Sequence, residues 1–436
     1  MPRVALHTLG CKLNYAETLT MGKQFVDRGY ELVEFGEPAD VCVINTCSVT
    51  ERADRECRQV IRRALRSSVQ PLVVVTGCYA QLEPEEVASI EGVDVVLGAR
   101  EKFNLFAYLG TLEKKPHPCV YVSDIGDVDN FGPAHSTHAG ERTRAFLKIQ
   151  DGCDFNCTFC TIPLARGTSR SQPIADCVHQ AMELVSQEYK EIVLTGVNVG
   201  DFGRKSGTNL LSLLRELVKV HGLERIRISS IEPNLLTREI IEFVAASAKM
   251  CDHFHIPLQS GDDEMLRRMR RRYTTGQYAE LIQAIKTRMP ECGIGVDVIV
   301  GFPGETEEHF ETTYRFLEEL PVSYLHVFTY SERPNTPAAS FAGGVEPRVR
   351  FARSERLRIL GQKKRHAFCS ASVGTMRPVL MESDVENGVR FGFTTNYVRV
   401  GLPAEATSEN SIVDANIVAM HDSKCIGRPV NQQVAA

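Results

Sequence analysis

The chain has 436 residues, 43% of them hydrophobic and 24% charged, with a formal net charge of −5, so it carries no global basic field for nucleic acid. This length predicts two to four domains with cores of ordinary size. No apolar run reaches the roughly 18 residues of a membrane helix, and the N-terminus turns polar too quickly for a signal peptide; we therefore expect a cytoplasmic protein with no membrane partner.

Residues 2–114 are predicted to form a first domain in which short apolar strands alternate with helices. This alternation predicts a parallel α/β sheet, and ligands of such sheets bind beyond the carboxyl ends of the strands. Three predicted strands are each followed closely by a cysteine. These cysteines are Cys11, Cys47 and Cys78. Their placement predicts a three-cysteine metal-cluster site at one edge of the sheet, with a catalytic cysteine set as the alternative.

Residues 115–140 are rich in Pro, Gly, His and Asp, which predicts a solvated linker. Residues 141–369 then contain six strand candidates separated by helical stretches. This count predicts a partial (β/α)6 barrel with its chemistry at the carboxyl ends of the strands. The overall fold class is therefore α/β.

The loop that follows the first barrel strand contains Cys153, Cys157 and Cys160 in C-x3-C-x2-C spacing. Such a loop can hold a 4Fe–4S cluster with one iron left free, because thiolates are the usual ligands of these clusters. A zinc site would need a fourth ligand nearby, and the next candidates, Cys177 and His179, are distant in sequence. A three-cysteine zinc loop or buried unligated thiols are the alternatives.

Further polar and glycine-rich motifs follow later barrel strands. They are TGVN at 195–198, SSIEP at 229–233, PLQSG at 257–261 and GFPGE at 301–305. Each alone is compatible with an ordinary strand-to-helix turn. Together they predict a functional rim at the carboxyl ends of the strands.

Two basic stretches, 267–272 and 348–366, stand out in this acidic chain. They favour either solvated helix surfaces or contacts to nucleic-acid phosphates. Residues 370–436 read as short strands and predict a small antiparallel β-barrel. Its aromatic residues Phe391, Phe393 and Tyr397 are candidates either for stacking on RNA bases or for the barrel core.

Several of these motifs resemble those of a known family. The cysteine loop with Phe159 resembles the signature of the radical S-adenosylmethionine superfamily. TLGCKLN, VINTCSVTERAD and VVTGCYAQ resemble the N-terminal domain of its methylthiotransferases, and residues 370–436 resemble the RNA-binding TRAM domain. RISSIEP, HIPLQSGDDEMLRRMRRRYT and DVIVGFPGET are most similar to the branch of the family that acts on threonylcarbamoyladenosine in tRNA.

The resemblance implies two 4Fe–4S clusters and S-adenosylmethionine, which together insert a methylthio group at carbon 2 of an adenine next to the anticodon. It also implies a set of cofactor neighbours. These are Phe159, Gly196, Asn198, Ser230, Gln259, Ile299 and Gly301. The glycine-glycine-glutamate form of the strand-two motif is absent, and TGVN stands in its place. The implied partners are the anticodon stem-loop of tRNA, a reductant such as flavodoxin or ferredoxin, and a sulfur donor.

Substrate choice is open at this point. Alternatives are isopentenyl-adenosine in tRNA, a ribosomal protein side chain, and a non-catalytic iron–sulfur protein that binds RNA. A threonylcarbamoyl group carries a carboxylate, which needs a cationic or multiply hydrogen-bonded partner when buried. Arg333, in the loop after the sixth strand, is the candidate clamp; the alternative is a surface arginine that contacts Glu332 or solvent.

Overall fold

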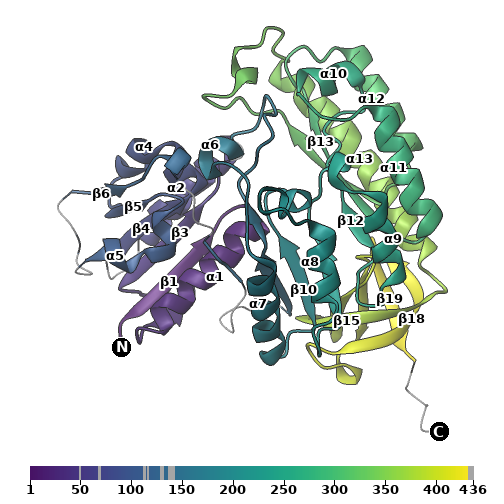
Figure 1. The fold of residues 1–436 in the computed structure, drawn as a ribbon, viewed down its shortest axis with the longest axis horizontal. Coiled ribbons are helices and arrows are strands. Elements are labelled where there is room, and N and C mark those ends of the chain that lie inside the picture. The colour runs from purple at the N-terminus through teal and green to yellow at the C-terminus, as the bar shows by residue number, and fades with distance from the viewer. Residues whose placement is uncertain are drawn as a thin grey trace.

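Three sheet systems, formed by successive parts of the chain, make up the molecule (Figure 1). The computed structural model describes residues 1–48, 51–66, 70–110, 114, 117–127, 132–135 and 143–430. In Figure 1 the purple and blue N-terminal domain lies beside the teal and green central domain, and the yellow C-terminal strands lie at one end of the central domain. No helix within these described ranges is long and apolar enough to cross a membrane.

The N-terminal sheet is parallel throughout, in the order β2-β1-β3-β4-β5-β6. Its strands are β1 (Arg3–Thr8), β2 (Glu31–Val33), β3 (Val41–Thr46), β4 (Leu72–Gly77), β5 (Val95–Leu97) and β6 (Cys119–Tyr121). The helices are α1 (Lys12–Val26), α2 (Glu51–Ala64), α3 (Cys78–Leu82), α4 (Pro84–Ala88) and α5 (Phe106–Leu109). Strands β3 and β4 are buried at every position, as expected of central strands covered on both faces. The predicted parallel α/β domain is confirmed.

The predicted linker, residues 115–140, differs from expectation where it is described. Strand β6 lies within it and extends the N-terminal sheet by pairing with β5. Farther along, His135 pairs with Leu147 of the first barrel strand. Residues 115–116, 128–131 and 136–140, which include His138, lie outside the described residues.

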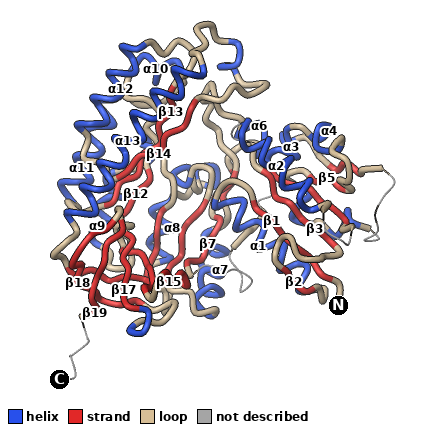
Figure 2. Tube along the Cα trace, turned by 180° about the vertical axis from the view of Figure 1, so that it is seen from behind, coloured by secondary structure: helices blue, strands red, loops and turns tan. Residues whose placement is uncertain are grey.

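The central domain is the predicted (β/α)6 half-barrel, built as two parallel three-stranded sheets. One has the order β11-β10-β7 and the other β12-β13-β14, and the bridges Ile226–Met250 and Ser230–His255 join them. The strands are β7 (Arg144–Lys148), β10 (Glu191–Thr195), β11 (Arg225–Ile228), β12 (His253–His255), β13 (Gly293–Val300) and β14 (Tyr324–Thr329). The helices are α7 (Ile174–Ser186), α8 (Leu210–Leu217), α9 (Arg238–Ala246), α10 (Asp263–Arg268), α11 (Thr275–Arg288), α12 (Glu307–Glu319) and α13 (Pro347–Ala371). Figure 2 shows α11, α12 and α13 along the outer side of β12–β14.

Alternate residues of the barrel strands face opposite sides of the sheet. Ala145 and Leu147 of β7 belong to the large core beneath the outer helices, whereas Phe146 faces inward. Helix α1 of the N-terminal domain packs on this inner face, where the rings of Tyr15 and Phe146 lie 5.7 Å apart, edge to face. The N-terminal domain is thus seated against the inside of the half-barrel at β7.

The C-terminal domain is a closed barrel in the order β15-β16-β17-β19-β18. Its strands are β15 (Met376–Glu386), β16 (Val389–Thr394), β17 (Arg399–Pro403), β18 (Ile412–His421) and β19 (Lys424–Pro429). The predicted barrel is confirmed, and its pairs are antiparallel except for β17 with β19. Phe391 is buried, and the rings of Phe393 and Tyr397 stack on each other with Arg144 of β7 over them. These aromatic residues therefore serve packing within and between domains.

Candidate cluster and cofactor site

The cysteine loop of the barrel runs from β8 (Gln150–Asp151) to α6 (Ile162–Arg166). Gly152 has a φ of +68°, and a Cβ there would lie 2.0 Å from the carbonyl oxygen of Thr168, so only glycine fits this turn. Cys157 is buried, while Cys153 and Cys160 are half-buried. Burial raises the pKa of Cys153 to about 11 and that of Cys160 to about 12, so both are neutral thiols until a metal displaces the proton.

Two neighbouring cavities meet at this loop. One, of about 490 Å³, is lined by all three cysteines of the loop together with Arg270 and Asn335. The second, of about 200 Å³, shares Cys160 with the first. Its other lining residues are Phe159, Thr161, Ile162, Gln259, Asp297, Ile299, Phe328, Thr329, Tyr330 and Ser331. Three predicted cofactor neighbours, Phe159, Gln259 and Ile299, therefore share one cavity beside the cysteines.

Asn198 and Gly196 lie on the β10 side of the same rim. The backbone N–H of Asn198 donates to Gln150 Oε1 over 2.8 Å, and a Cβ on Gly196 would crowd the Gln150 side chain at 2.9 Å. Both polar atoms of the Asn198 amide are buried without a hydrogen-bond partner in the described part of the chain. Since buried amides are normally bonded, the orphaned pair fits a polar ligand such as S-adenosylmethionine.

The last two predicted cofactor neighbours have structural contacts of their own. Ser230 forms a backbone bridge with His255, where the two halves of the barrel join. Gly301 has a φ of +75°, and its N–H donates to Glu305 Oε1 over 2.9 Å. Neither residue is among those lining the two cavities. Their predicted roles as cofactor neighbours stay predictions.

The second cysteine set lies at the carboxyl edge of the N-terminal sheet, as predicted. The β3–β4 register pairs Thr46 with Gly77, so Cys47 and Cys78 follow from adjacent strand ends. A Cβ on Gly10 would lie 2.7 Å from Cys47 Sγ, which brings the Cys11 loop against Cys47. Cys11 is exposed, whereas Cys47 and Cys78 are buried.

Cys57 and Cys119 stand apart from this set. The Cys57 thiol donates to the backbone carbonyl of Cys47 over 3.3 Å, and Cys119 lies on the edge strand β6. Across the described residues, no three His, Cys, Asp or Glu side chains are grouped as ligands of a single metal ion. A 4Fe–4S cluster places a different requirement on its ligands, because each cysteine binds a different iron.

Arg333 has partners other than those predicted. Its Nη1 lies 2.5 Å from Asp54 Oδ2 and its Nη2 lies 2.6 Å from Ser48 Oγ. The residue is only 5% exposed, so it is not a surface arginine, and Glu332 pairs with Arg350 instead. The guanidinium thus binds the N-terminal domain beside Cys47. A clamp on a substrate carboxylate stays a prediction, and one that these contacts disfavour.

Several residues that complete the site carry no individual signal in the sequence. Arg271 Nη1 donates to Cys157 Sγ over 3.0 Å, and Asp297 pairs with His255 at 2.9 Å inside the barrel. Asn14 and Arg166 lie between the two cysteine sets and are bonded to each other. Asn14 and Arg166 each lie close to a cysteine motif in the sequence, which is a hint at their role. Their pairing is not visible in the sequence, because the two residues belong to different domains.

Comparisons with known proteins agree with this geometry. Residues 147–317 match the model of the radical SAM superfamily, and residues 3–98 match the uncharacterized protein family UPF0004. The chain is 41% identical to the threonylcarbamoyladenosine tRNA methylthiotransferase MtaB of Bacillus subtilis (strain 168), over 96% of this chain and 94% of that protein. It is 40% identical to the MtaB of Aquifex aeolicus (strain VF5), over 91% and 96%.

More distant relatives carry other names. The tRNA-2-methylthio-N(6)-dimethylallyladenosine synthase of Methylobacillus flagellatus is 32% identical over 95% of this chain and 96% of that protein. Among solved structures, the radical S-adenosylmethionine methyltransferase TsrM from Kitasatospora setae has a TM-score of 0.56 at 18% identity, over 78% of this chain and 77% of that one. This last likeness concerns the fold alone.

Proposed function

The chain belongs to the radical SAM methylthiotransferases, and on that premise we propose that it converts N6-threonylcarbamoyladenosine next to the tRNA anticodon into its 2-methylthio derivative. The observation that carries the proposal is the pair of three-cysteine sites. One lies at the carboxyl edge of the N-terminal sheet, and the other lies at the carboxyl ends of the half-barrel strands, beside a cavity. The relatives that are 41% and 40% identical to this chain are named for this activity.

Each of the two sites supplies three cysteines of the chain as ligands for one cluster. Cys153, Cys157 and Cys160 would hold one 4Fe–4S cluster, and Cys11, Cys47 and Cys78 the other. When bound, these clusters and S-adenosylmethionine supply the radical chemistry and the sulfur that an unactivated C–H bond requires. Three thiolates at each site leave one iron without a protein ligand.

The cavity residues would then orient the cofactor. Phe159 and Ile299 of the cavity would offer apolar surface to an adenine ring, and the unpaired amide of Asn198, at the rim outside the cavity lining, would offer both a donor and an acceptor. Phe302 holds the ring of Phe159 edge to face at 6.5 Å, which fixes its direction. Gln259 adopts a positive φ of +71°, so the loop that carries it is held in a constrained turn beside the cavity.

The interior of the barrel favours the threonylcarbamoyl substrate over the isopentenyl one. An isopentenyl group would require an apolar pocket, whereas the inner face below the cavity carries the His255–Asp297 pair and the exposed ring of His326. Phe328 lies two residues after His326 on β14 and is 44% exposed, so its ring offers a flat apolar surface for a base. A polar lumen with one exposed phenyl ring suits a base that bears a polar substituent.

The proposed reaction also needs partners that the chain does not contain. A one-electron reductant such as flavodoxin or ferredoxin and a donor of sulfur would have to reach the two sites, and the tRNA substrate places the reaction in the cytoplasm.

The test is to offer anticodon stem-loops with threonylcarbamoyladenosine, isopentenyl-adenosine or unmodified adenosine to the anaerobically reconstituted protein with S-adenosylmethionine and reductant. Nucleoside mass spectrometry should show the 2-methylthio product from the threonylcarbamoyl form.

Cys153→Ala should abolish formation of 5′-deoxyadenosine. The triple Cys11→Ala, Cys47→Ala, Cys78→Ala variant should form 5′-deoxyadenosine without the 2-methylthio product. Preferential turnover of the isopentenyl form would sink the substrate assignment. Absence of 5′-deoxyadenosine from the unsubstituted protein would sink the enzyme assignment.

A further inference from the structure

Five charged side chains meet out of water where α1, β7 and α6 come together. No side chain of the five is more than 6% exposed. Glu17 of α1 is the centre: its carboxylate lies 2.6 Å from Lys102 Nζ, 3.0 Å from Lys148 Nζ and 3.0 Å from Arg166 Nη1. Asp151 is the second acid, 2.7 Å from Lys148 and 3.0 Å from Arg166. The group joins the N-terminal domain to the barrel.

The acids of this group are ionised. Burial alone would raise the pKa of Glu17, but the charges of Arg166, Lys102 and Lys148 outweigh it and hold that pKa well below its ordinary value. Asp151 lies between two of the same cations, because its carboxylate oxygens are 2.7 Å from Lys148 Nζ and 3.0 Å from Arg166 Nη1. Two carboxylates therefore face three cationic side chains, which leaves one excess positive charge.

Arg166 extends this group to the loops that carry the N-terminal cysteines. Its Nη2 donates to Asn14 Oδ1 over 2.5 Å. The amide nitrogen of Asn14 in turn donates to the carbonyls of Leu9 and Thr46, each over 2.9 Å. Leu9 lies two residues before one cluster cysteine, and Thr46 directly precedes another. One guanidinium from the barrel thus fixes two ligand loops of the N-terminal site.

The excess charge lies next to the loops that carry these cysteines. Arg166 bonds to Asn14, three residues after Cys11, and Asn14 donates to the carbonyl that precedes Cys47. Helix α6, which ends at Arg166, packs on helix α3, which begins at Cys78. Arg170, 3.7 Å from Asp151 at the rim, adds to the excess rather than cancelling it. A buried excess charge is costly unless something nearby compensates it, and a cluster on three thiolates is anionic.

We propose that Arg166 is the positioning residue of the N-terminal cluster site: it fixes the Cys11 and Cys47 loops through Asn14, and the excess positive charge of its group stabilises the reduced, more negative state of the cluster. The proposal rests on the assignment of a cluster to Cys11, Cys47 and Cys78. It goes beyond the ligands themselves, because it names the charge that sets the cluster's potential.

The experiment uses the full-length chain with Cys153, Cys157 and Cys160 replaced by Ala, so that only the N-terminal cluster remains. Its midpoint potential is measured by a redox titration followed by electron paramagnetic resonance. Arg166→Gln removes a positive charge and should move the potential to a more negative value. Glu17→Gln removes a negative charge with little change of shape and should move it to a more positive value. Arg166→Lys keeps the charge, so its midpoint potential should stay close to that of the chain with Arg166 intact.

If Arg166→Gln does not bind a cluster, two further variants still test whether the excess charge sets the potential. Lys102→Met removes a charge of the group without touching Asn14 and should also lower the potential. Arg227→Gln removes a buried arginine at the opposite end of the barrel, where it pairs with Glu191, and should leave the potential unchanged. Equal potentials in Glu17→Gln and Lys102→Met, or shifts of the same sign, would overturn the proposal. Failure of this background to assemble any cluster would instead overturn the assignment of the cysteines.

Discussion

At the scale of single residues, Arg271 is the cation that faces the barrel cysteines. Its Nη1 donates to Cys157 Sγ, its Nε donates to the hydroxyl of Tyr273 over 3.1 Å, and its remaining terminal nitrogen pairs with Glu232. Burial raises the pKa of the Cys157 thiol, and the charge of Arg271 opposes that rise. A hydrogen bond from a cation stabilises electron-rich sulfur, and such bonds help to set the potentials of iron–sulfur clusters.

Arg271→Gln should therefore make the potential of the barrel cluster more negative while the iron stays bound. The measurement is a redox titration of the chain with Cys11, Cys47 and Cys78 replaced by Ala, together with an iron count of about four per chain. Arg268→Gln is the matched control, since Arg268 ends α10, three residues before Arg271, but donates to the carbonyl of Pro303 instead of to sulfur. An unchanged or more positive potential in Arg271→Gln would contradict this role.

At the scale of elements, the loop after β14 and helix α2 are joined by Arg333. Asp54 of α2, 7% exposed, accepts from Arg333 and from Ser48, so three buried groups satisfy one another across the domain boundary. Removing one partner of a buried ion pair leaves an uncompensated charge, which costs roughly 3–5 kcal/mol. Removing both partners leaves no such charge.

Arg333→Gln should destabilise the contact between the domains by roughly 3–5 kcal/mol, and the double variant Arg333→Gln, Asp54→Asn should recover much of that loss. The measurement is the shift of the first unfolding transition in calorimetry of the anaerobic protein. Arg288→Gln, whose ion pair with Glu242 is exposed on both partners, serves as the comparison and should shift the transition little. Additive effects of the two substitutions would show that Arg333 and Asp54 are not coupled.

The elements that the sequence predicts well are those with local signals. The buried runs of β3 and β4 and the β/α alternation depend on neighbours in the chain, and both predictions are confirmed. Interdomain partners have no such local signal. Arg333 and Asp54 are 279 residues apart, and Arg166 and Asn14 are 152 apart. An arginine in a rim loop looks the same in sequence whether it binds a substrate or another domain.

The basic stretches show the same limit. Arg353 and Arg356 of α13 pair with Glu305, Glu307 and Glu311, so they hold α13 on α12. Lys364 donates to the carbonyls of Glu318 and Leu320 at the end of α12. Half of this stretch is therefore a packing surface, which its charge alone could not reveal.

At the scale of the whole molecule, the C-terminal barrel closes the amino-terminal end of the half-barrel. Arg225 donates to the carbonyls of Phe393 and Pro378, and Arg227 donates to those of Thr394 and Thr395. With that end covered, a macromolecular substrate must reach the cysteine loop from the opposite end, where the carboxyl ends of the strands lie. The surface around α10 is at that end.

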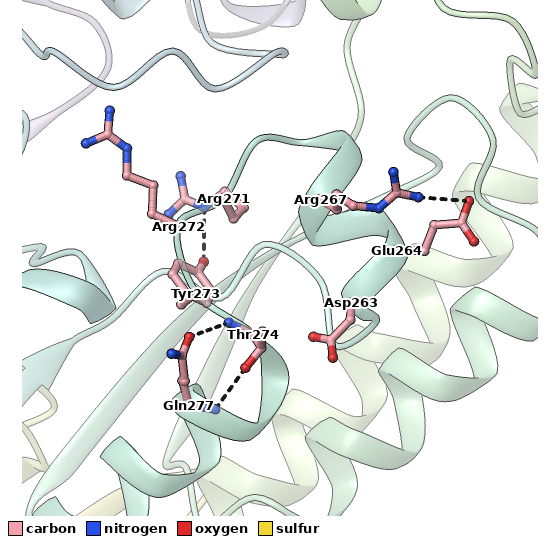
Figure 3. Close-up of a pocket in the computed structure, with 8 residues that line it drawn as sticks. All are labelled: Asp263, Glu264, Arg267, Arg271, Arg272, Tyr273, Thr274 and Gln277. Atoms are coloured by element: carbon pink, nitrogen blue, oxygen red, sulfur yellow. Dashed lines mark hydrogen bonds and ion pairs between the residues drawn. The ribbon is translucent and has the colours of Figure 1, made fainter.

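A shallow cavity of about 620 Å³ marks this surface (Figure 3). Arg271 turns back to Tyr273, Arg267 points toward Glu264, which lies 4.0 Å from it, and Arg272 points away from both. Arg272 lies over the ring of Phe155, 3.9 Å from its centroid, and so extends the basic surface to the cysteine loop. Arg267 is 76% exposed on its side chain, and Arg270 is exposed as well. We expect these exposed arginines to contact phosphates of the tRNA substrate.

The double variant Arg267→Ala, Arg270→Ala should weaken tRNA binding and flatten its dependence on salt. Each phosphate contact contributes about 0.7–0.9 to the slope of log affinity against log salt, so the loss of two contacts should lower the slope by about 1.4–1.8. The measurement is tRNA affinity at several salt concentrations, by fluorescence anisotropy. Arg356→Ala removes an equally basic side chain that is committed to Glu307 and Glu311, and its slope should match that of the unsubstituted protein. A slope that is unchanged in the double variant, or lowered equally in Arg356→Ala, would place the tRNA on another face.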